Sequence, residues 1–204
     1  MNSILFSINL KEFPWRILLK YLIFSLSISL LHFFLDDVLI SNEKVNFDYK
    51  KINENLIVYS FLIIIIFPVI EELAFRLPLK HNSLLWLSGS IILVYIVLLE
   101  HSFFKIVLIF YLSILILHKF KRSKFWTMLV TMISILSFTL IHLSNYNSLN
   151  EIKVYELIYI LIPQGVVGIL ATRIRLLYNT LCSIIYHTAY NGFIVLITVN
   201  CWKC

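Results

Sequence analysis

The chain has 204 residues, of which 60% are hydrophobic and only 14% are charged. A typical soluble domain is nearer half apolar and a quarter charged, so this composition excludes an ordinary soluble protein and indicates an integral membrane protein. The formal net charge of +6 is explained by basic residues in cytoplasmic loops, and nothing in the sequence resembles a nucleic-acid-binding module.

Apolar runs of membrane-spanning length follow one another along the chain. Because a helix needs about 20 apolar residues to cross the bilayer, the sequence predicts an all-α fold. We expect a polytopic transmembrane helical bundle of about seven helices in a single integral membrane domain, 1–204, with the third and fourth helices short. The predicted helices are residues 17–35, 56–75, 84–99, 103–118, 126–143, 155–172 and 180–199.

Basic residues gather in every second connection between these helices. They occur at 11–20, at 76–80, at 119–124 and at 173–175, whereas the intervening connections are acidic, mixed or neutral. The positive-inside rule therefore predicts a cytoplasmic N-terminus and a C-terminus on the opposite side. The bias towards Ile, Leu, Lys and Asn resembles that of an AT-rich bacterium, so we expect the bacterial inner (plasma) membrane.

The most informative residues are polar side chains within apolar segments, where a charge costs about 2.5–3.5 kcal/mol. Glu71, Glu72 and Arg76 follow Pro68 in the second segment. Residues four apart share a helix face, so Glu72 can pair with Arg76 and leave Glu71 free to face another group. Pro68 is expected to free a backbone carbonyl and kink the helix. The alternative interpretation is an interfacial charge cluster that ends the helix.

Two further pairs of residues have the same four-residue spacing. Phe138 and His142 share a face at the end of the fifth segment, and His187 and Asn191 share one inside the seventh. Separately, His142 can be an interfacial histidine, and the other pair can form an interhelical hydrogen bond. Together with Glu71 they are the parts of a hydrolytic site. A carboxylate can act as base towards water, a histidine can orient it, and an amide can donate to an oxyanion.

The absence of two kinds of sequence motif limits which catalytic mechanisms the chain can use. No serine or cysteine nucleophile motif accompanies these residues, which favours water as the nucleophile. There is no HExxH motif, although a Glu-His-His metal site stays possible on ligand grounds. The predicted topology places Glu71 and His187 in the cytoplasmic halves of their helices and His142 near the opposite end of its own. Their meeting would require a long tilted helix, a deep water cavity or a different helix boundary.

The three motifs, in this order, resemble those of the CAAX protease and bacteriocin-processing (CPBP) family of intramembrane endopeptidases. The family pattern EExxxR, FxxxH and HxxxN is matched by 71–76, 138–142 and 187–191. The resemblance covers residues 56–199 and includes Pro163-Gln164-Gly165 and Gly168. Leu77 stands where members usually have glycine. The interval between the first two motifs is longer than usual, which fits an inserted hydrophobic hairpin at 84–118.

The resemblance implies a core like that of the CAAX prenyl endopeptidases and a metal-independent mechanism with no cofactor. Glu71 would activate water, His142 would help to orient it, and His187 and Asn191 would hold the oxyanion of the tetrahedral intermediate. The supporting residues would be Glu72, Arg76 and Phe138. The partners expected are membrane lipid and a membrane-associated peptide or protein substrate, with no nucleic acid, and the sequence sets no oligomeric state.

Two other functions remain open at this level. Some family members are linked to bacteriocin immunity or act as scaffolds, so the first alternative is a non-enzymatic membrane protein on the same fold. The second is a transporter that uses Glu71 and the histidines as a proton relay. Transporters often contain internal repeats, and this sequence shows no convincing repeat.

Overall fold

The computed structural model describes residues 13–39, 55–79, 82–121, 123–145 and 153–201, and these residues are helical almost throughout, with no strand among them. The predicted all-α fold is therefore confirmed. The main helices are α1 (Trp15–Leu39), α3 (Leu56–Phe61), α4 (Phe67–Glu71), α5 (Leu85–Leu98), α6 (Ser102–Phe120), α7 (Lys124–Ile141), α8 (Val154–Leu177) and α9 (Thr180–Cys201). Short turns named η2 to η6 link or extend some of them.

Six helical segments in the described part are long and apolar enough to cross a membrane. They are Trp15–Leu35, Leu56–Leu79, Ser102–Phe120, Lys124–Ser144, Val154–Leu177 and Thr180–Val199. The remaining predicted segment, the third in chain order, is α5, whose 14 residues extend about 21 Å, less than the roughly 30 Å of a hydrocarbon core. The expectation that the fourth segment is also short is wrong, because α6 has 19 residues.

Large apolar side chains on the outside of the bundle fit this assignment. Ile57, Val97 and Phe34 are 85%, 78% and 73% exposed. A soluble monomer rarely leaves large contiguous apolar patches in water. Lipid tails solvate such side chains at no cost, so the exposed faces of these helices are suited to contact with the bilayer.

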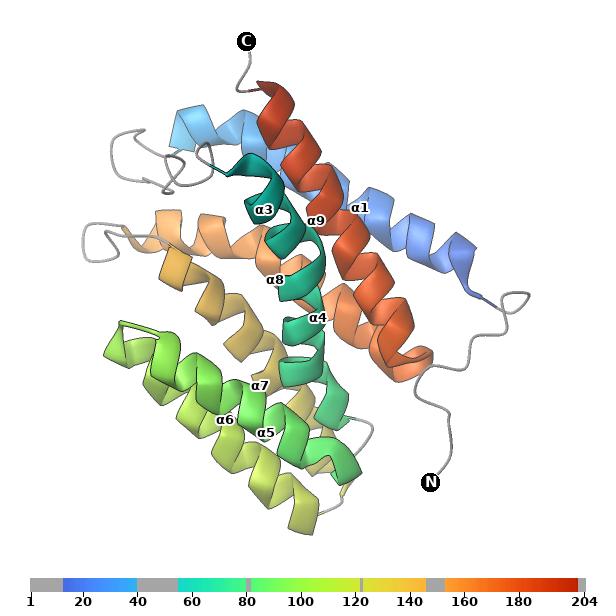
Figure 1. Cartoon of the computed structure of the whole chain (residues 1–204), viewed down its shortest axis with the longest axis vertical. Helices are drawn as coiled ribbons and strands as arrows, with labels where there is room; N and C mark the ends of the chain where they lie inside the picture. Colours follow the sequence, from blue (N-terminus) through green and yellow to red (C-terminus); the bar gives the residue numbers. More distant parts are fainter. Residues whose placement is uncertain (1–12, 40–54, 80–81, 122, 146–152, 202–204) are drawn as a thin grey trace.

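The segment 56–79 lies across the middle of the molecule, inclined to the helices on either side of it (Figure 1). On one side α1, α8 and α9 pack against one another, and on the other α6 packs against both α5 and α7. Contacts between α7 and α8 join the two groups. The central segment contacts α9 along much of its length and reaches α5 and α7 near its end.

The central segment is widened twice, each time just before a proline. Two π-helical turns, η2 (Leu62–Ile66) and η3 (Glu72–Arg76), interrupt the α-helix. The amide of Phe67 donates to the carbonyl of Leu62, and that of Leu77 donates to Glu72, five residues back in each case. The next residue is Pro68 or Pro78, which has no N–H to donate and clashes with the preceding turn of a regular α-helix. The prediction that Pro68 disturbs the helix thus corresponds to a wide turn rather than to an end.

The central segment ends inside the bundle, at a buried 3₁₀ turn η4 (Leu77–Leu79). Carbonyl groups at a helix end lack partners within the helix and need other donors where water is excluded. Side chains of surrounding helices provide them. Ser88 donates to Ala74, Tyr111 and Ser134 both donate to Phe75, and Arg175 donates to Leu77.

These donors include residues of the hairpin 84–118, which the sequence suggested to be an insertion. The hairpin consists of η5 (Asn82–Leu84), α5 and α6, and it contributes Ser88 and the fully buried Tyr111. Its residues Ile92 and Leu108 are also fully buried in the main hydrophobic core. The hairpin is therefore part of the packing that supports the end of the central segment.

Replacing Ser88 by alanine should destabilise the protein, because the Ala74 carbonyl loses its donor in a buried place. We expect a loss of about 1 kcal/mol, the usual size of a polar contact between membrane helices. Thermal unfolding in detergent measures it. Ser90→Ala is the matched control, since Ser90 is exposed on the same helix and bonds only its own helix at Trp86. Equal losses in the two variants would contradict the assigned role of Ser88.

Candidate active site

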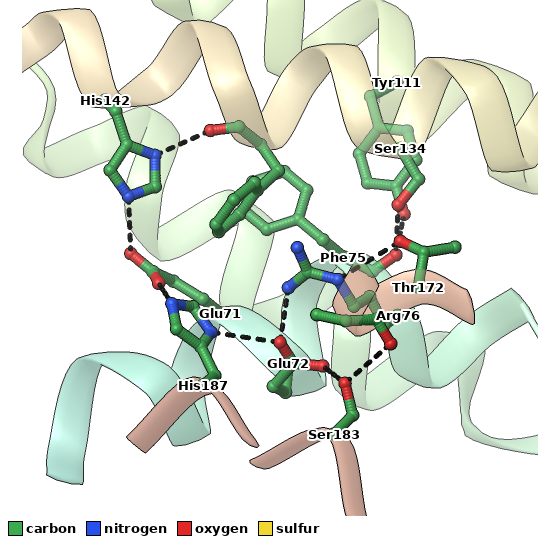
Figure 2. Close-up of polar contacts among 12 residues, drawn as sticks. Glu71, Glu72, Phe75, Arg76, Tyr111, Ser134, His142, Thr172, Ser183 and His187 are labelled. Carbon is green, nitrogen blue, oxygen red and sulfur yellow. Dashed lines mark hydrogen bonds and ion pairs between the residues drawn. The ribbon is translucent and has the colours of Figure 1, made fainter. Parts of the chain in front are cut away.

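The two consecutive glutamates end up in different surroundings. Glu71 is the last residue of α4 and Glu72 the first of the wide turn η3. The side chain of Glu72 is fully buried, whereas that of Glu71 is 13% exposed. Figure 2 shows Glu72 enclosed by polar partners and Glu71 facing two histidine rings. The sequence predicted this difference, with Glu72 paired and Glu71 left free to face another group.

Glu72 is held by three side chains from two helices. Its Oε1 accepts from Arg76 Nη1 at 2.5 Å and from His187 Nδ1 at 3.0 Å, and its Oε2 accepts from Ser183. The expected pair of Glu72 and Arg76 is thus present. Ser183 and His187 both lie on α9, so the buried carboxylate fixes α9 to the central segment.

Arg76 is buried as completely as its partner, with a side chain only 1% exposed. Its Nε donates to Thr172 Oγ1 at 3.3 Å, and its guanidinium carbon lies 4.1 Å from the centre of the Phe138 ring. An aromatic face attracts a cation. That contact helps to compensate for Nη2, which has no hydrogen-bond partner in the part of the chain that the structure describes.

His187 bridges the two glutamates. A carboxylate paired with a guanidinium is an acceptor only, so the bond to Glu72 requires that His187 Nδ1 carries the proton. In the neutral ring, Nε2 is then an acceptor. This Nε2 lies 3.5 Å from Glu71 Oε2.

His142 lies on the opposite side of Glu71 from His187. Its ring is oriented in the same way, with Nδ1 bonded within the protein and Nε2 facing the carboxylate. It follows the last residue of α7 and begins the 3₁₀ turn η6 (His142–Asn145). Its Nδ1 lies 2.8 Å from the carbonyl oxygen of Phe138, which can only accept, so Nδ1 is the donor. The free Nε2 lies 3.8 Å from Glu71 Oε1.

The site therefore brings three hydrogen-bond acceptors together. Two ring nitrogens with lone pairs face the carboxylate of Glu71, at distances of 3.5 and 3.8 Å that exceed direct hydrogen bonds. One water oxygen about 2.8 Å from a carboxylate oxygen and from a ring nitrogen can join them, giving one O–H to each. The arrangement is suited to bind a water molecule and to take a proton from it.

The three residues meet although the predicted topology places His142 at a different depth from the other two. The central segment is inclined to α7, as Figure 1 shows. Position along an inclined helix does not translate directly into depth. This crossing allows His142 to lie beside Glu71 although the two residues occupy different positions along their helices.

Phe138, which the sequence suggested as a supporting residue, lies against both histidines. Its ring centre lies 4.6 Å from that of His142 and 5.6 Å from that of His187, in edge-on geometry with both. Gly168 on α8 allows this position, because a Cβ added there would lie 3.0 Å from the Cδ1 of Phe138. Phe138 therefore packs against both histidines and against the guanidinium of Arg76.

Asn191, the fourth residue predicted to be catalytic, has a different partner. Its Nδ2 donates to the backbone carbonyl of Ile63 at 2.9 Å. Ile63 lies two turns before Glu71 on the central segment. The structure thus brings Glu71, His142 and His187 together and places the Asn191 amide against the first wide turn.

Sequence reasoning missed Ser183 and Thr172, which complete the polar contacts of Glu72 and Arg76. A signal for Ser183 exists, since it precedes His187 by four residues and so shares its helix face. Thr172 has no such signal, because its partner is on another helix and threonine is common in membrane helices.

Comparison of the chain with protein families, with curated proteins and with solved structures gave no match. Among the described residues, no group of three or more His, Cys, Asp or Glu side chains is arranged to hold a metal ion. Independence of metal is a prediction that a chelation experiment has to test.

Gly168→Ala should harm the site and the fold together. The new methyl group would meet the Phe138 ring at 3.0 Å, and overpacking of this kind costs about 1–3 kcal/mol. Gly165→Ala is the matched control on the same helix, where the nearest atom is a Thr139 methyl at 3.8 Å. Thermal unfolding of both variants in detergent measures the difference. If Gly168→Ala is as stable as Gly165→Ala, the tight contact with Phe138 is not required.

Arg76→Ala should reduce the yield of folded protein, because it leaves Glu72 buried without its cation. Removing one partner of a buried ion pair costs about 3–5 kcal/mol. Size-exclusion chromatography and thermal unfolding in detergent measure the loss, with Arg173→Ala as control because Arg173 is exposed on α8. Normal folding of Arg76→Ala, with loss of activity only, would instead make Arg76 a substrate-contacting residue.

Proposed function

We propose that this protein is an intramembrane endopeptidase that hydrolyses a peptide bond of a membrane-associated protein or peptide. The observation that carries the proposal is the convergence of the Glu71 carboxylate with the Nε2 atoms of His142 and His187, in a bundle whose helices can cross a membrane. The order of the motifs, which resembles that of the CPBP family, supports it.

In the proposed reaction, a water molecule held between Glu71 and His142 attacks the carbonyl carbon of the scissile bond. Glu71 accepts one proton from this water as the new C–O bond forms, and the carbonyl oxygen becomes an oxyanion. The tetrahedral intermediate then breaks its C–N bond, and the proton held by Glu71 passes to the departing amine. The products are a carboxylic acid and an amine. Because water itself attacks the carbonyl carbon, no covalent enzyme intermediate forms.

His187 is the group best placed to stabilise the oxyanion. It can donate from Nε2 only when that nitrogen also carries a proton, so the proposed reaction begins with His187 protonated on both ring nitrogens, as an imidazolium, and with His142 neutral. Glu72 lies directly against Nδ1 and stabilises this cation, as the buried carboxylate does in a serine-protease triad. Because the Asn191 amide is bonded to the Ile63 carbonyl, the proposed mechanism does not depend on Asn191 as an oxyanion donor.

Glu71→Gln tests the proposal most directly, since it keeps the shape of the side chain and removes the base. Cleavage should fall by about 10²–10⁴-fold, the usual contribution of a general base, while the melting temperature stays unchanged. The substrate can be found by comparing new protein N-termini in membranes of cells that express the wild type or Glu71→Gln. A synthetic peptide that spans the identified cleavage site then gives the rate in detergent. Glu100→Gln, on an exposed residue, is the control.

A chelator series on the purified protein, with total metal measured, decides between a metal-independent glutamate mechanism and a metal-dependent one. The same three side chains could serve in either. Activity that persists without metal and disappears in Glu71→Gln supports the glutamate mechanism. Stoichiometric zinc whose removal abolishes activity and whose return restores it would replace that mechanism by a metal site. If wild type and Glu71→Gln protect cells equally in an immunity assay and neither yields new N-termini, the non-enzymatic alternative is correct.

A further inference from the structure

The first wide turn of the central segment leaves one backbone carbonyl without its usual donor. In η2 the Phe67 amide donates to the Leu62 carbonyl. The next bond in this pattern would run from residue 68 to the carbonyl of Ile63. Residue 68 is proline, which has no N–H. In an apolar environment such a carbonyl needs another donor, because an unsatisfied group there costs several kcal/mol.

The side chain of Asn191 provides that donor. Its Nδ2 lies 2.9 Å from the Ile63 carbonyl oxygen. The two helices are close enough at this level for a short side chain to reach, since a Cβ added at Gly192 would lie 3.7 Å from the Cγ2 of Ile64. Asn191 also lies four residues after His187, so one face of α9 contacts the central segment both before and after Pro68.

We propose that Asn191 is a positioning residue that acts together with Pro68: by capping the Ile63 carbonyl it holds the η2 turn in its wide form and thereby sets the direction in which Glu71 points. This inference rests on the proposed function in so far as it concerns activity. A π-turn holds one more residue than an α-helical turn, and each residue of an α-helix turns the chain by about 100°. If η2 closed to an α-helical turn, Glu71 would rotate by about that angle and leave the two histidines.

A double-mutant cycle with Pro68→Ala separates this role from a direct one in the reaction. Alanine at position 68 has a backbone N–H, which can donate to the Ile63 carbonyl in place of Asn191. Asn191→Ala should therefore lower the melting temperature by roughly 2–4 °C in the wild type, the shift expected for one lost bond in a chain of this size, and by less than half of that in Pro68→Ala. Equal losses in the two backgrounds would overturn the proposal.

Thr198→Val is the control for the cycle. The hydroxyl of Thr198 bonds the Ile194 carbonyl of its own helix, so its replacement should cost the same in both backgrounds. This control shows whether Pro68→Ala hides stability losses in general. The cycle reports on Asn191 even if the protein cleaves nothing, so failure of the proposed function and failure of this inference give different results.

The activity arm uses the same variants once a substrate peptide is known. If Asn191 acts through the backbone, kcat of the double variant should match that of Pro68→Ala alone. A loss of about 10²–10³-fold in both backgrounds, with unchanged melting temperatures, is the result expected of an oxyanion donor and would contradict the positioning role.

Hydrogen exchange gives a test that does not require Pro68→Ala to fold. In Asn191→Ala, the backbone amides of residues 62–72 should exchange faster than in the wild type, while those of α6 remain unchanged. Unaltered exchange across 62–72 would show that Asn191 does not hold the wide turn.

Discussion

A helix that is broken by prolines and ends within an apolar bundle must find hydrogen-bond donors for its carbonyl groups elsewhere. The central segment 56–79 has both properties, and its carbonyls accept from side chains of five different helices. These donors are Ser88 on α5, Tyr111 on α6, Ser134 on α7, Arg175 on α8 and Asn191 on α9. In lipid, helices gain little from burying apolar surface against one another. Polar contacts of this kind therefore help to fix which helices surround the central segment.

The same segment carries two neighbouring carboxylates with opposite tasks. Glu72 has a guanidinium, a hydroxyl and an imidazole around it, and all its interactions are within the protein. Glu71 faces the Nε2 atoms of two histidines and retains some exposure. One carboxylate therefore stabilises the arrangement of helices, and the other remains free for chemistry. His187 connects them, so the position of the reactive group depends on the structural one.

The extent to which this structure could be predicted from the sequence depends on how local each feature is. The length of the apolar runs predicted the helices. The four-residue spacing predicted the contact of Glu72 with Arg76 and that of Phe138 with His142. The expectation that Glu71, His142 and His187 share one site came from three motifs taken together. The partner of Asn191 could not be predicted, because its acceptor is created by a proline on a distant segment. The short α5 was expected and the full length of α6 was not, since both segments read as similar apolar runs.

The polar residues of α9 also limit how this helix can be aligned. Ser183, His187 and Asn191 follow one another at intervals of four, and each contacts the central segment. A row of residues four apart is inclined by about 26° to the axis of its helix, so a partner that follows the row must cross α9 obliquely. A slip of one helical turn, 5.4 Å, would mismatch all three contacts together. Three short side chains in an otherwise apolar helix thus specify both its register and its crossing direction during assembly in the membrane.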